Sequence, residues 1–423
     1  MCVRRLDNIK IDFTEYQRKI LGNLGYYGLA QTRIDKKQRK NDYFLRSTYT
    51  LPKILYWCYY ANTLLKAIFL AFLILDYFGP VVFLDKIAAL DYILCVGIVT
   101  LGSCIWFLRY PLFEILYAFW KTENSIYNSL GLPEDLKLLV DKRQFATVWI
   151  HLIIVWFGCS CLVLQFYADP KYCVFTYSIF ELDTWYLRII FCAHEFFFML
   201  HAWCNMTSSG SLCTFQGIVL ANLINRMTEA IEALTQKQVQ CRNKRETGKH
   251  FMNETTKKRN GGILHHPNLR LNYDIEKLIL DYKKLMLISD RFNSWVSYKI
   301  VFLHTCGYCQ FISDVFVAMQ ILKMPDTGFA DVWFYIEDSL ASMYMIYRVY
   351  KFMSRVQPAS EKFLRALQMY IIANSRRRNQ LRKVLVTLKV VSLKLGPCPV
   401  VPMTVVKALE MLLQYYVVVA LWH

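Results

Sequence analysis

The chain has 423 residues, of which 55% are hydrophobic and 16% aromatic, and its mean hydropathy is +0.25. A globular core of this length does not need so much apolar surface, so the composition excludes an ordinary soluble domain and predicts helices that face lipid. The formal net charge of +18 would suit a nucleic-acid-binding protein, but the placement of the basic residues excludes that class.

Seven hydrophobic runs come close to the ~20 residues that a helix needs to cross ~30 Å of hydrocarbon. In chain order these runs are 54–78, 88–109, 144–168, 184–205, 296–322, 332–352 and 400–421. The predicted fold is therefore an all-α membrane protein with seven transmembrane helices.

The basic residues decide the orientation of these predicted spans. Most of the 50 lysines and arginines fall in four segments on one side of the membrane: 1–53, 110–143, 206–295 and 351–396. The three segments on the other side contain one lysine each: Lys86, Lys171 and Lys323. Because basic loops stay in the cytoplasm, the N-terminus is predicted to be cytoplasmic and the C-terminus extracellular. We expect these basic residues to interact with membrane lipid, and we expect no nucleic-acid partner.

The first predicted region, residues 1–53, is a cytoplasmic N-terminal segment. It has no apolar stretch followed by a small-residue cleavage site, so we do not expect a signal peptide there. The second region, residues 54–352, contains six of the predicted spans and the long cytoplasmic loop 206–295. The first span is expected to target the chain to the membrane.

The long loop carries a helical pattern at each end. Apolar residues spaced by four, four and three positions share one helical face: Leu223, Met227, Ile231 and Leu234. This pattern predicts that the fourth span continues into the cytoplasm. The polar, basic stretch from Lys237 to Gly262 is predicted to be a flexible loop, and helical periodicity resumes at Tyr273.

The third predicted region, residues 353–399, is a cytoplasmic anchor segment. A helix is expected from about Leu381 to Leu395, after the basic cluster "SRRR", which either holds anionic lipid or acts as a stop-transfer signal. The next stretch, "GPCPVVP", contains one glycine and three prolines, which remove backbone donors and end a helix. The seventh hydrophobic element is therefore predicted to be split.

The last region, residues 400–423, is the seventh predicted span, and one of its faces is polar. At about 100° per residue, a sector of about 140° holds the following side chains: Thr404, Lys407, Glu410, Met411, Gln414, Tyr415, Val418, Leu421 and Trp422. Either this polar stripe packs against the other helices of the same chain, or copies of the helix meet about an axis and line an ion path. In the second case the path narrows at Val418, Leu421 and Trp422.

No catalytic, metal or cofactor site is predicted. The motif "CGYC" at Cys306–Cys309 lies within the fifth predicted span, where cysteines usually act as small apolar residues. His265 and His266 have no cysteine or carboxylate nearby at ligand spacing. We therefore do not expect an enzyme.

The final residues, "YYVVVALWH", resemble the closing signature of insect gustatory receptors, which reads Thr-Tyr, five hydrophobic residues and Gln-Phe. Tyr416 matches the tyrosine, and residues 417–421 match the hydrophobic run. Tyr415, Trp422 and His423 stand where the family has Thr, Gln and Phe. The chain length, the orientation and the long connection between the fourth and fifth spans also agree with this family.

The resemblance implies a tetrameric, ligand-gated, non-selective cation channel of the insect chemoreceptor superfamily, in the plasma membrane of sensory-neuron dendrites. It implies that the seventh helix lines a central pore, that the cytoplasmic helix ends anchor the subunits, and that tastants enter from outside. The tetramer would be a homomer or would include other gustatory receptor subunits. Because Trp422 replaces the usual Gln, a subunit that conducts only within a heteromer is an open alternative.

Ionisable residues inside spans are costly and often mark functional sites. The resemblance implies a ligand pocket among the second to sixth spans, reached from outside. The outward halves of these spans contain six candidate residues: Gln165, His194, Phe311, Asp314, Tyr335 and Asp338. Each of them would serve equally well in a hydrogen bond between helices or as an aromatic side chain that faces lipid.

Three other functions compete with a taste receptor. A G-protein-coupled receptor has its N-terminus outside, and the chain lacks Asp-Arg-Tyr after the third span and Asn-Pro-x-x-Tyr in the last. A secondary transporter is expected to have internal repeats and paired broken helices, whereas the chain has one break and no repeat. An odorant receptor of the same superfamily would share topology and channel function, and it stays open.

Overall fold

The computed structural model describes residues 51–77, 79–80, 112–130, 184–247, 275–323, 329–374 and 378–421, with isolated positions between 86 and 167. This part of the chain is mostly helical, which agrees with the predicted all-α class. Among these residues, no helix combines the length and the hydropathy needed to span a membrane. The number of spans and the side on which each terminus lies stay predictions.

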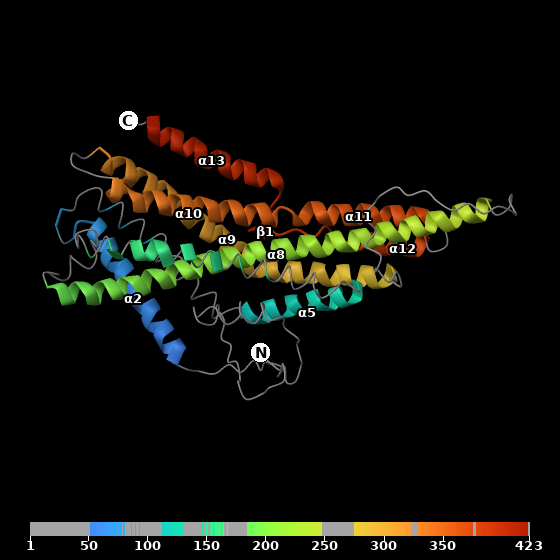
Figure 1. Cartoon of the computed structure of the whole chain (residues 1–423), viewed down its shortest axis with the longest axis horizontal. Helices are drawn as coiled ribbons and strands as arrows, with labels where there is room; N and C mark the ends of the chain where they lie inside the picture. The colour runs from blue at the N-terminus through green and yellow to red at the C-terminus, as the bar shows by residue number, and fades with distance from the viewer. Residues whose placement is uncertain are drawn as a thin grey trace.

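Two long helices form the frame of the molecule. α8 runs from Trp185 to Thr247, and α9 runs from Ile275 to Ile321. α10 (Phe329–Met353) and α11 (Val356–Ala373) follow one another along this frame, and α2 (Leu51–Ile74) lies toward the end where α8 begins (Figure 1). α10 contacts both long helices, and α11 contacts α8. α8 and α9 therefore run along the length of an elongated helical bundle (Figure 1).

A proline separates α10 from α11. Pro358 has no N–H to donate to the carbonyl of Ser354, and its ring would clash with that carbonyl in a continuous helix. The chain makes a turn at residues 354–355 instead. The N–H of Ala359 then donates to the carbonyl of Arg355 at 3.4 Å, at the start of α11.

α8 is longer than the sequence pattern predicts. It extends through Thr247, so the prediction of a flexible loop is wrong for residues 237–247. This stretch is rich in glutamine, lysine and arginine, which have high intrinsic helix propensity. Gln238 also donates to the Tyr370 hydroxyl of α11 at 2.9 Å, which holds the start of the extension against the bundle. Residues 248–274 lie outside the described part of the chain.

The core lies where α5 (Leu112–Leu130), α8, α9 and α11 meet. The predicted apolar face of α8 is confirmed, because its members are buried or half-buried in this core: Leu223, Met227, Ile231 and Leu234. Phe119 and Trp120 of α5 contact the ring of Phe215 in α8, with centroids 6.3 and 6.2 Å apart. Burial of side chains of this size stabilises the fold by about 1.5–3 kcal/mol each.

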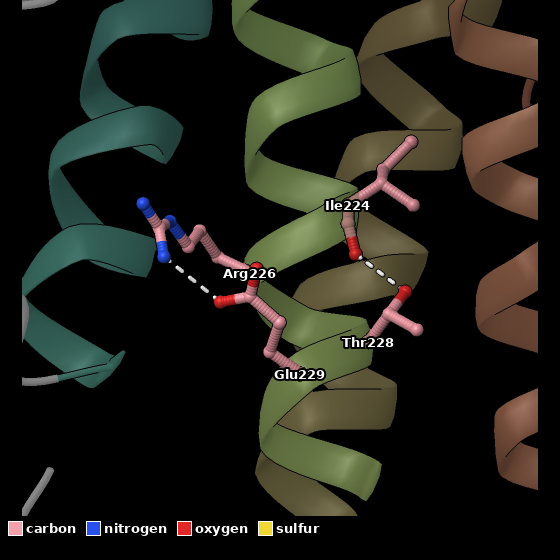
Figure 2. Close-up of polar contacts among 4 residues, drawn as sticks. All are labelled: Ile224, Arg226, Thr228 and Glu229. Atoms are coloured by element: carbon pink, nitrogen blue, oxygen red, sulfur yellow. Dashed lines mark hydrogen bonds and ion pairs between the residues drawn. The ribbon is translucent and has the colours of Figure 1, made fainter. Parts of the chain in front are cut away.

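The polar side chains of the same segment of α8 find partners within the helix. Arg226 and Glu229 leave the helix on one side and pair at 2.9 Å, while Thr228 lies on the other side (Figure 2). The Thr228 hydroxyl donates to the carbonyl of Ile224 at 2.8 Å. Because Thr228 is fully buried, this bond removes the cost of an unpaired hydroxyl.

Glycine lets α8 and α10 approach each other closely. A Cβ atom added at Gly217 would lie 2.6 Å from the carbonyl oxygen of Phe352, which is backbone and has no room to move. A Cβ atom at Gly210 would lie 2.9 Å from the end of the flexible Met345 side chain. The contact between the two helices therefore requires glycine at position 217.

The predicted helix from Leu381 to Leu395 is wrong in its second half. α12 spans only Arg378–Val386, and the chain is non-helical from there to Val401. β-branched residues lower helix propensity and favour extended backbone, and four of them fall at this point: Val386, Thr387, Val390 and Val391. The side chains of Leu388, Val391 and Leu393 are instead buried in the core.

A small hairpin follows this extended stretch. β1 (Lys394–Leu395) pairs in antiparallel register with β2 (Cys398–Pro399). Gly396 turns the chain with φ of +57°, a conformation that glycine adopts at little cost. α13 (Pro402–Leu421) begins after the hairpin, so the interruption lies where the prolines and glycine predict it.

Candidate functional site

The start of α13 is defined by its own first residues. Pro402 occupies the first helical position, where the missing N–H would have no partner in any case. The N–H of Val401 donates to the Thr404 hydroxyl at 3.1 Å, which is half of a capping box. Thr404, which the sequence predicts for the polar stripe, therefore closes the start of the helix and is half-buried.

α13 diverges from α10 toward the C-terminal end of the chain (Figure 1). It contacts α9 and α10 through a narrow face on which Ala408 and Leu412 are buried. Away from this contact, a broad apolar face is exposed: Val406, Leu409, Leu413, Tyr416 and Val417. The polar stripe lies between these two faces.

Five members of the predicted polar stripe are exposed: Lys407, Glu410, Met411, Gln414 and Val418. The amide of Gln414 donates to the Glu410 carboxylate at 3.4 Å, so two of them interact along the helix. The described helices of the same chain leave the stripe uncovered at these five positions. The choice between a stripe that packs within its own subunit and one that lines an ion path stays a prediction.

The edges of the stripe are less exposed or lie outside the described residues. Tyr415 is half-buried, beside the face that carries Ala408 and Leu412. The side chain of Leu421, together with Trp422 and His423, lies outside the described residues. The narrow end of the predicted ion path and the last two positions of the family signature therefore stay predictions.

Four of the six ligand candidates come from the α9–α10 pair. Phe311 and Asp314 of α9 and Asp338 of α10 are buried, and Tyr335 is half-buried against an apolar cluster around Val332. The two helices contact each other. These four candidates therefore lie on one pair of contacting helices.

A buried amide that the sequence reasoning missed lies at this interface. Gln310 of α9 donates a hydrogen bond to the Asp338 carboxylate of α10, and both side chains are 4% exposed. The inter-helix hydrogen bond foreseen as an alternative role is therefore present for Asp338. The missed signal was the spacing of Gln310 and Asp314, four residues apart on one helical face.

Further buried polar residues lie on the same two helices: His304 on α9, and Ser339 and Ser342 on α10. The His304 ring lies 4.6 Å from that of Tyr350, with the planes tilted by 47°. Small-molecule sites are typically lined by apolar side chains with a few polar groups, and α9 and α10 carry buried residues of both kinds.

The other two candidates do not join this interface. His194 lies exposed on α8, where its Nε2 is 3.2 Å from the Asn62 amide of α2. Nearby on α8, the Phe196 ring meets that of Trp156 at 5.4 Å. Gln165 lies outside the described residues. Within the part of the chain that the structure describes, no three His, Cys, Asp or Glu side chains are grouped to hold a metal ion.

The sequence matches no protein-family profile and no curated protein at a significant level. Solved structures are nevertheless similar to it over nearly its whole length. The insect olfactory receptor OR5 from Machilis hrabei superposes with a TM-score of 0.60 at 12% identity, covering 96% of this chain and 97% of that one. The same receptor in complex with eugenol superposes with a TM-score of 0.61 at 11% identity over the same shares. The chain therefore has the fold of an insect olfactory receptor.

Proposed function

We propose that this chain is a chemoreceptor subunit that forms a ligand-gated, non-selective cation channel in the plasma membrane and responds to tastants. The observation that carries this proposal is the exposed polar stripe of α13. A helix with Lys407, Glu410 and Gln414 on one face and an apolar opposite face needs water or protein beside the polar face. Copies of α13 arranged around a central axis supply that water-filled path.

In the proposed channel, each of four subunits contributes one α13. Thr404, Lys407 and Glu410 lie near the cytoplasmic mouth, and Gln414 and Tyr415 follow toward the outside. Val418, Leu421 and Trp422 form an apolar constriction that closes the path by excluding water. The exposed apolar face around Leu413 and Tyr416 then faces lipid.

The proposed ligand site lies between α9 and α10. Phe311 and Tyr335 supply apolar contact, and Asp314 and Asp338 supply polar groups. The structural neighbour that binds eugenol supports a small organic molecule as the kind of ligand. His194 and Gln165 are retained as outlying candidates on other segments.

An odorant receptor is the second candidate function, and the likeness to olfactory receptor structures supports it as well as it supports a taste receptor. The two functions differ in the tissue that carries the receptor. Transcript in taste neurons would support a tastant receptor, whereas transcript confined to olfactory neurons would support an odorant receptor.

The pore proposal is tested with cysteines on two faces of α13. Val418 on the stripe is 58% exposed and Leu413 on the apolar face is 67% exposed, so exposure alone predicts the same reactivity. A membrane-impermeant cationic thiol reagent should alter the current of cells that express Val418→Cys and leave Leu413→Cys unchanged. An unaltered current after confirmed modification of Val418→Cys would refute a pore-lining stripe.

The proposed orientation has a separate test. A peptide tag added after His423 should bind antibody on intact cells, because seven spans from a cytoplasmic N-terminus bring the end of α13 outside. A tag at the N-terminus should become accessible only after permeabilisation. The reverse pattern would contradict the topology and leave the fold unaffected.

A further inference from the structure

The segment between α12 and α13, residues 387–401, is fastened to α9 by side chains. The Asn293 amide nitrogen donates to the carbonyl of Ser392 at 2.8 Å, and its amide oxygen accepts from the N–H of Lys394 at 3.0 Å. The Ser289 hydroxyl donates to the same Ser392 carbonyl at 3.2 Å. We name these contacts of Ser289 and Asn293 with residues 392–394 the linker clasp.

A second set of bonds holds the preceding residues of the same segment. The Tyr282 hydroxyl of α9 donates to the carbonyl of Lys389 at 3.0 Å and also meets the hydroxyl of Ser360 in α11. The Ser360 hydroxyl accepts from the N–H of Val391 at 2.7 Å. Ser289, Asn293 and Tyr282 are all buried, so water does not compete well for these groups.

The clasp lies directly before the last helix. Lys394 begins the hairpin, and the N–H of Gly396 at its turn donates to the carbonyl of Ser297, one turn beyond Asn293 on α9, at 3.3 Å. The glycine and prolines that interrupt the helix would by themselves leave a free hinge at this point. With the clasp closed, the base of α13 is fixed to α9.

α9 also carries the proposed ligand residues. Asn293 and Phe311 lie on one uninterrupted helix, 18 residues apart, which is about 27 Å at 1.5 Å per residue. A continuous helix transmits a shift or rotation along its length far better than a loop does. The same element therefore contacts the proposed ligand site at one end and the base of the proposed pore helix further along.

We propose that Asn293 is a positioning residue that couples α9 to α13, so that movement at the α9–α10 ligand site reaches the pore through the linker clasp. This inference rests on the proposed channel function. A free hinge at "GPCPVVP" is the opposing arrangement, in which α13 moves independently of α9.

The clasp itself is tested by hydrogen exchange on the full chain in detergent. In Asn293→Ala, peptides that cover residues 388–400 should exchange about tenfold faster than in the unaltered chain, because the Lys394 N–H loses its acceptor. Ser294→Ala is the matched control, since Ser294 is exposed and donates only to the Arg291 carbonyl of its own helix. Peptides from α11 should keep their protection in both variants. Equal exchange of residues 388–400 in all three proteins would overturn the clasp.

The coupling is tested without any ligand, with a cationic methanethiosulfonate as the probe. In a Val418→Cys background, adding Asn293→Ala should change the modification rate about fivefold, whereas adding Ser294→Ala should not. The chain with Val418 intact serves as the blank for its native cysteines. Modification of Val418→Cys at equal rates in all backgrounds would overturn the coupling and leave the pore assignment intact. No modification of Val418→Cys in any background refutes the pore assignment and the coupling with it.

A milder variant covers the case in which Asn293→Ala does not reach the cell surface. Ser289→Ala removes one of the three bonds of the clasp and keeps the Asn293 amide in place. Both the exchange rate of residues 388–400 and the modification rate at Val418→Cys should then change in the same direction by a smaller factor. A change in one rate without the other would overturn the link between clasp and pore.

Discussion

Tyr282 of α9 and Phe363 of α11 stack their rings with centroids 4.3 Å apart and planes within 10° of parallel. Beyond the stack, the Tyr282 hydroxyl contacts Ser360 and the carbonyl of Lys389. Burial raises the pKa of Tyr282, against the opposing effects of Ser360 and the backbone of Val391, so the hydroxyl stays protonated and can donate at neutral pH. A single side chain thus connects two helices and the linker that precedes α13.

Tyr282→Phe keeps the stacked ring and removes the hydroxyl. We expect the free energy of unfolding to fall by about 1–3 kcal/mol, because buried partners lose a hydrogen bond. Tyr282→Ala should cost about 3–5 kcal/mol, since it also removes the ring. Tyr344→Phe is the control, because Tyr344 is exposed, and it should change stability by less than about 0.5 kcal/mol. Denaturation of the purified chain in detergent measures all three, and equal stability of Tyr282→Phe and the unaltered chain would contradict the role of the hydroxyl.

Gly217→Ala should force α8 and α10 apart, because the new Cβ meets the Phe352 carbonyl at 2.6 Å. Gly307→Ala on α9 is the matched variant. Its Cβ would lie 3.3 Å from the end of the flexible Ile346 side chain, and alanine favours a helix over glycine by about 1 kcal/mol. We therefore expect a lower melting temperature for Gly217→Ala and an equal or higher one for Gly307→Ala. The opposite order would mean that the two helices do not approach closely at Gly217.

Asp338→Ala should destabilise the α9–α10 pair by about 1–3 kcal/mol, because it leaves the buried Gln310 amide without its acceptor. Asp338→Asn keeps an oxygen that accepts the same bond and should lose less. Leu340→Ala, two residues along α10, is 55% exposed and serves as the control. Surface expression together with thermal unfolding measures the effect, and similar losses for Asp338→Ala and Leu340→Ala would show that the pair contributes nothing.

Glu410→Lys should lower cation current and move the reversal potential in a salt gradient toward that of anions. A ring of four carboxylates at the mouth of a pore attracts cations, and the substitution replaces it with a ring of like-charged ammonium groups. Glu361→Lys introduces the same change of charge on α11, away from α13, and is expected to leave selectivity unaltered. Identical reversal potentials for the two variants would contradict a pore that Glu410 lines.

Helical periodicity predicted the parts of the fold in which packing follows local pattern. The Leu223–Met227–Ile231 face is buried as its spacing requires, and the interruption before Pro402 follows from the chemistry of proline and glycine. The predicted helix bounds were wrong where residues distant in the sequence determine the local structure. Asn293 and Ser289 bind the backbone of Ser392, about a hundred positions later in the chain. No local pattern around residues 388–394 predicts this contact.

For the candidate site too, the sequence predicts features that lie within one helix and misses contacts between helices. The polar stripe of α13 follows from the positions of Lys407, Glu410 and Gln414 alone, because a helix wheel needs no partner. The pairing of Asp338 with Gln310 depends on how α9 and α10 are aligned, and one sequence does not contain that register. The search for candidates started from ionisable side chains, and the amides Gln310 and Asn293 were passed over although they make bonds between elements.

The length of α8 has a mechanical consequence. Its 63 residues extend about 95 Å, whereas the hydrocarbon core of a bilayer is about 30 Å thick. In the proposed channel, roughly 60 Å of this helix extends beyond the membrane, so a small tilt of the helix produces a large displacement at its far end. A tilt of about 5° at the membrane would displace its far end by about 5 Å, several times more than the same tilt moves the groups that line the ion path. A fluorescent label on the far end of α8 would therefore report opening with greater sensitivity than one at the gate.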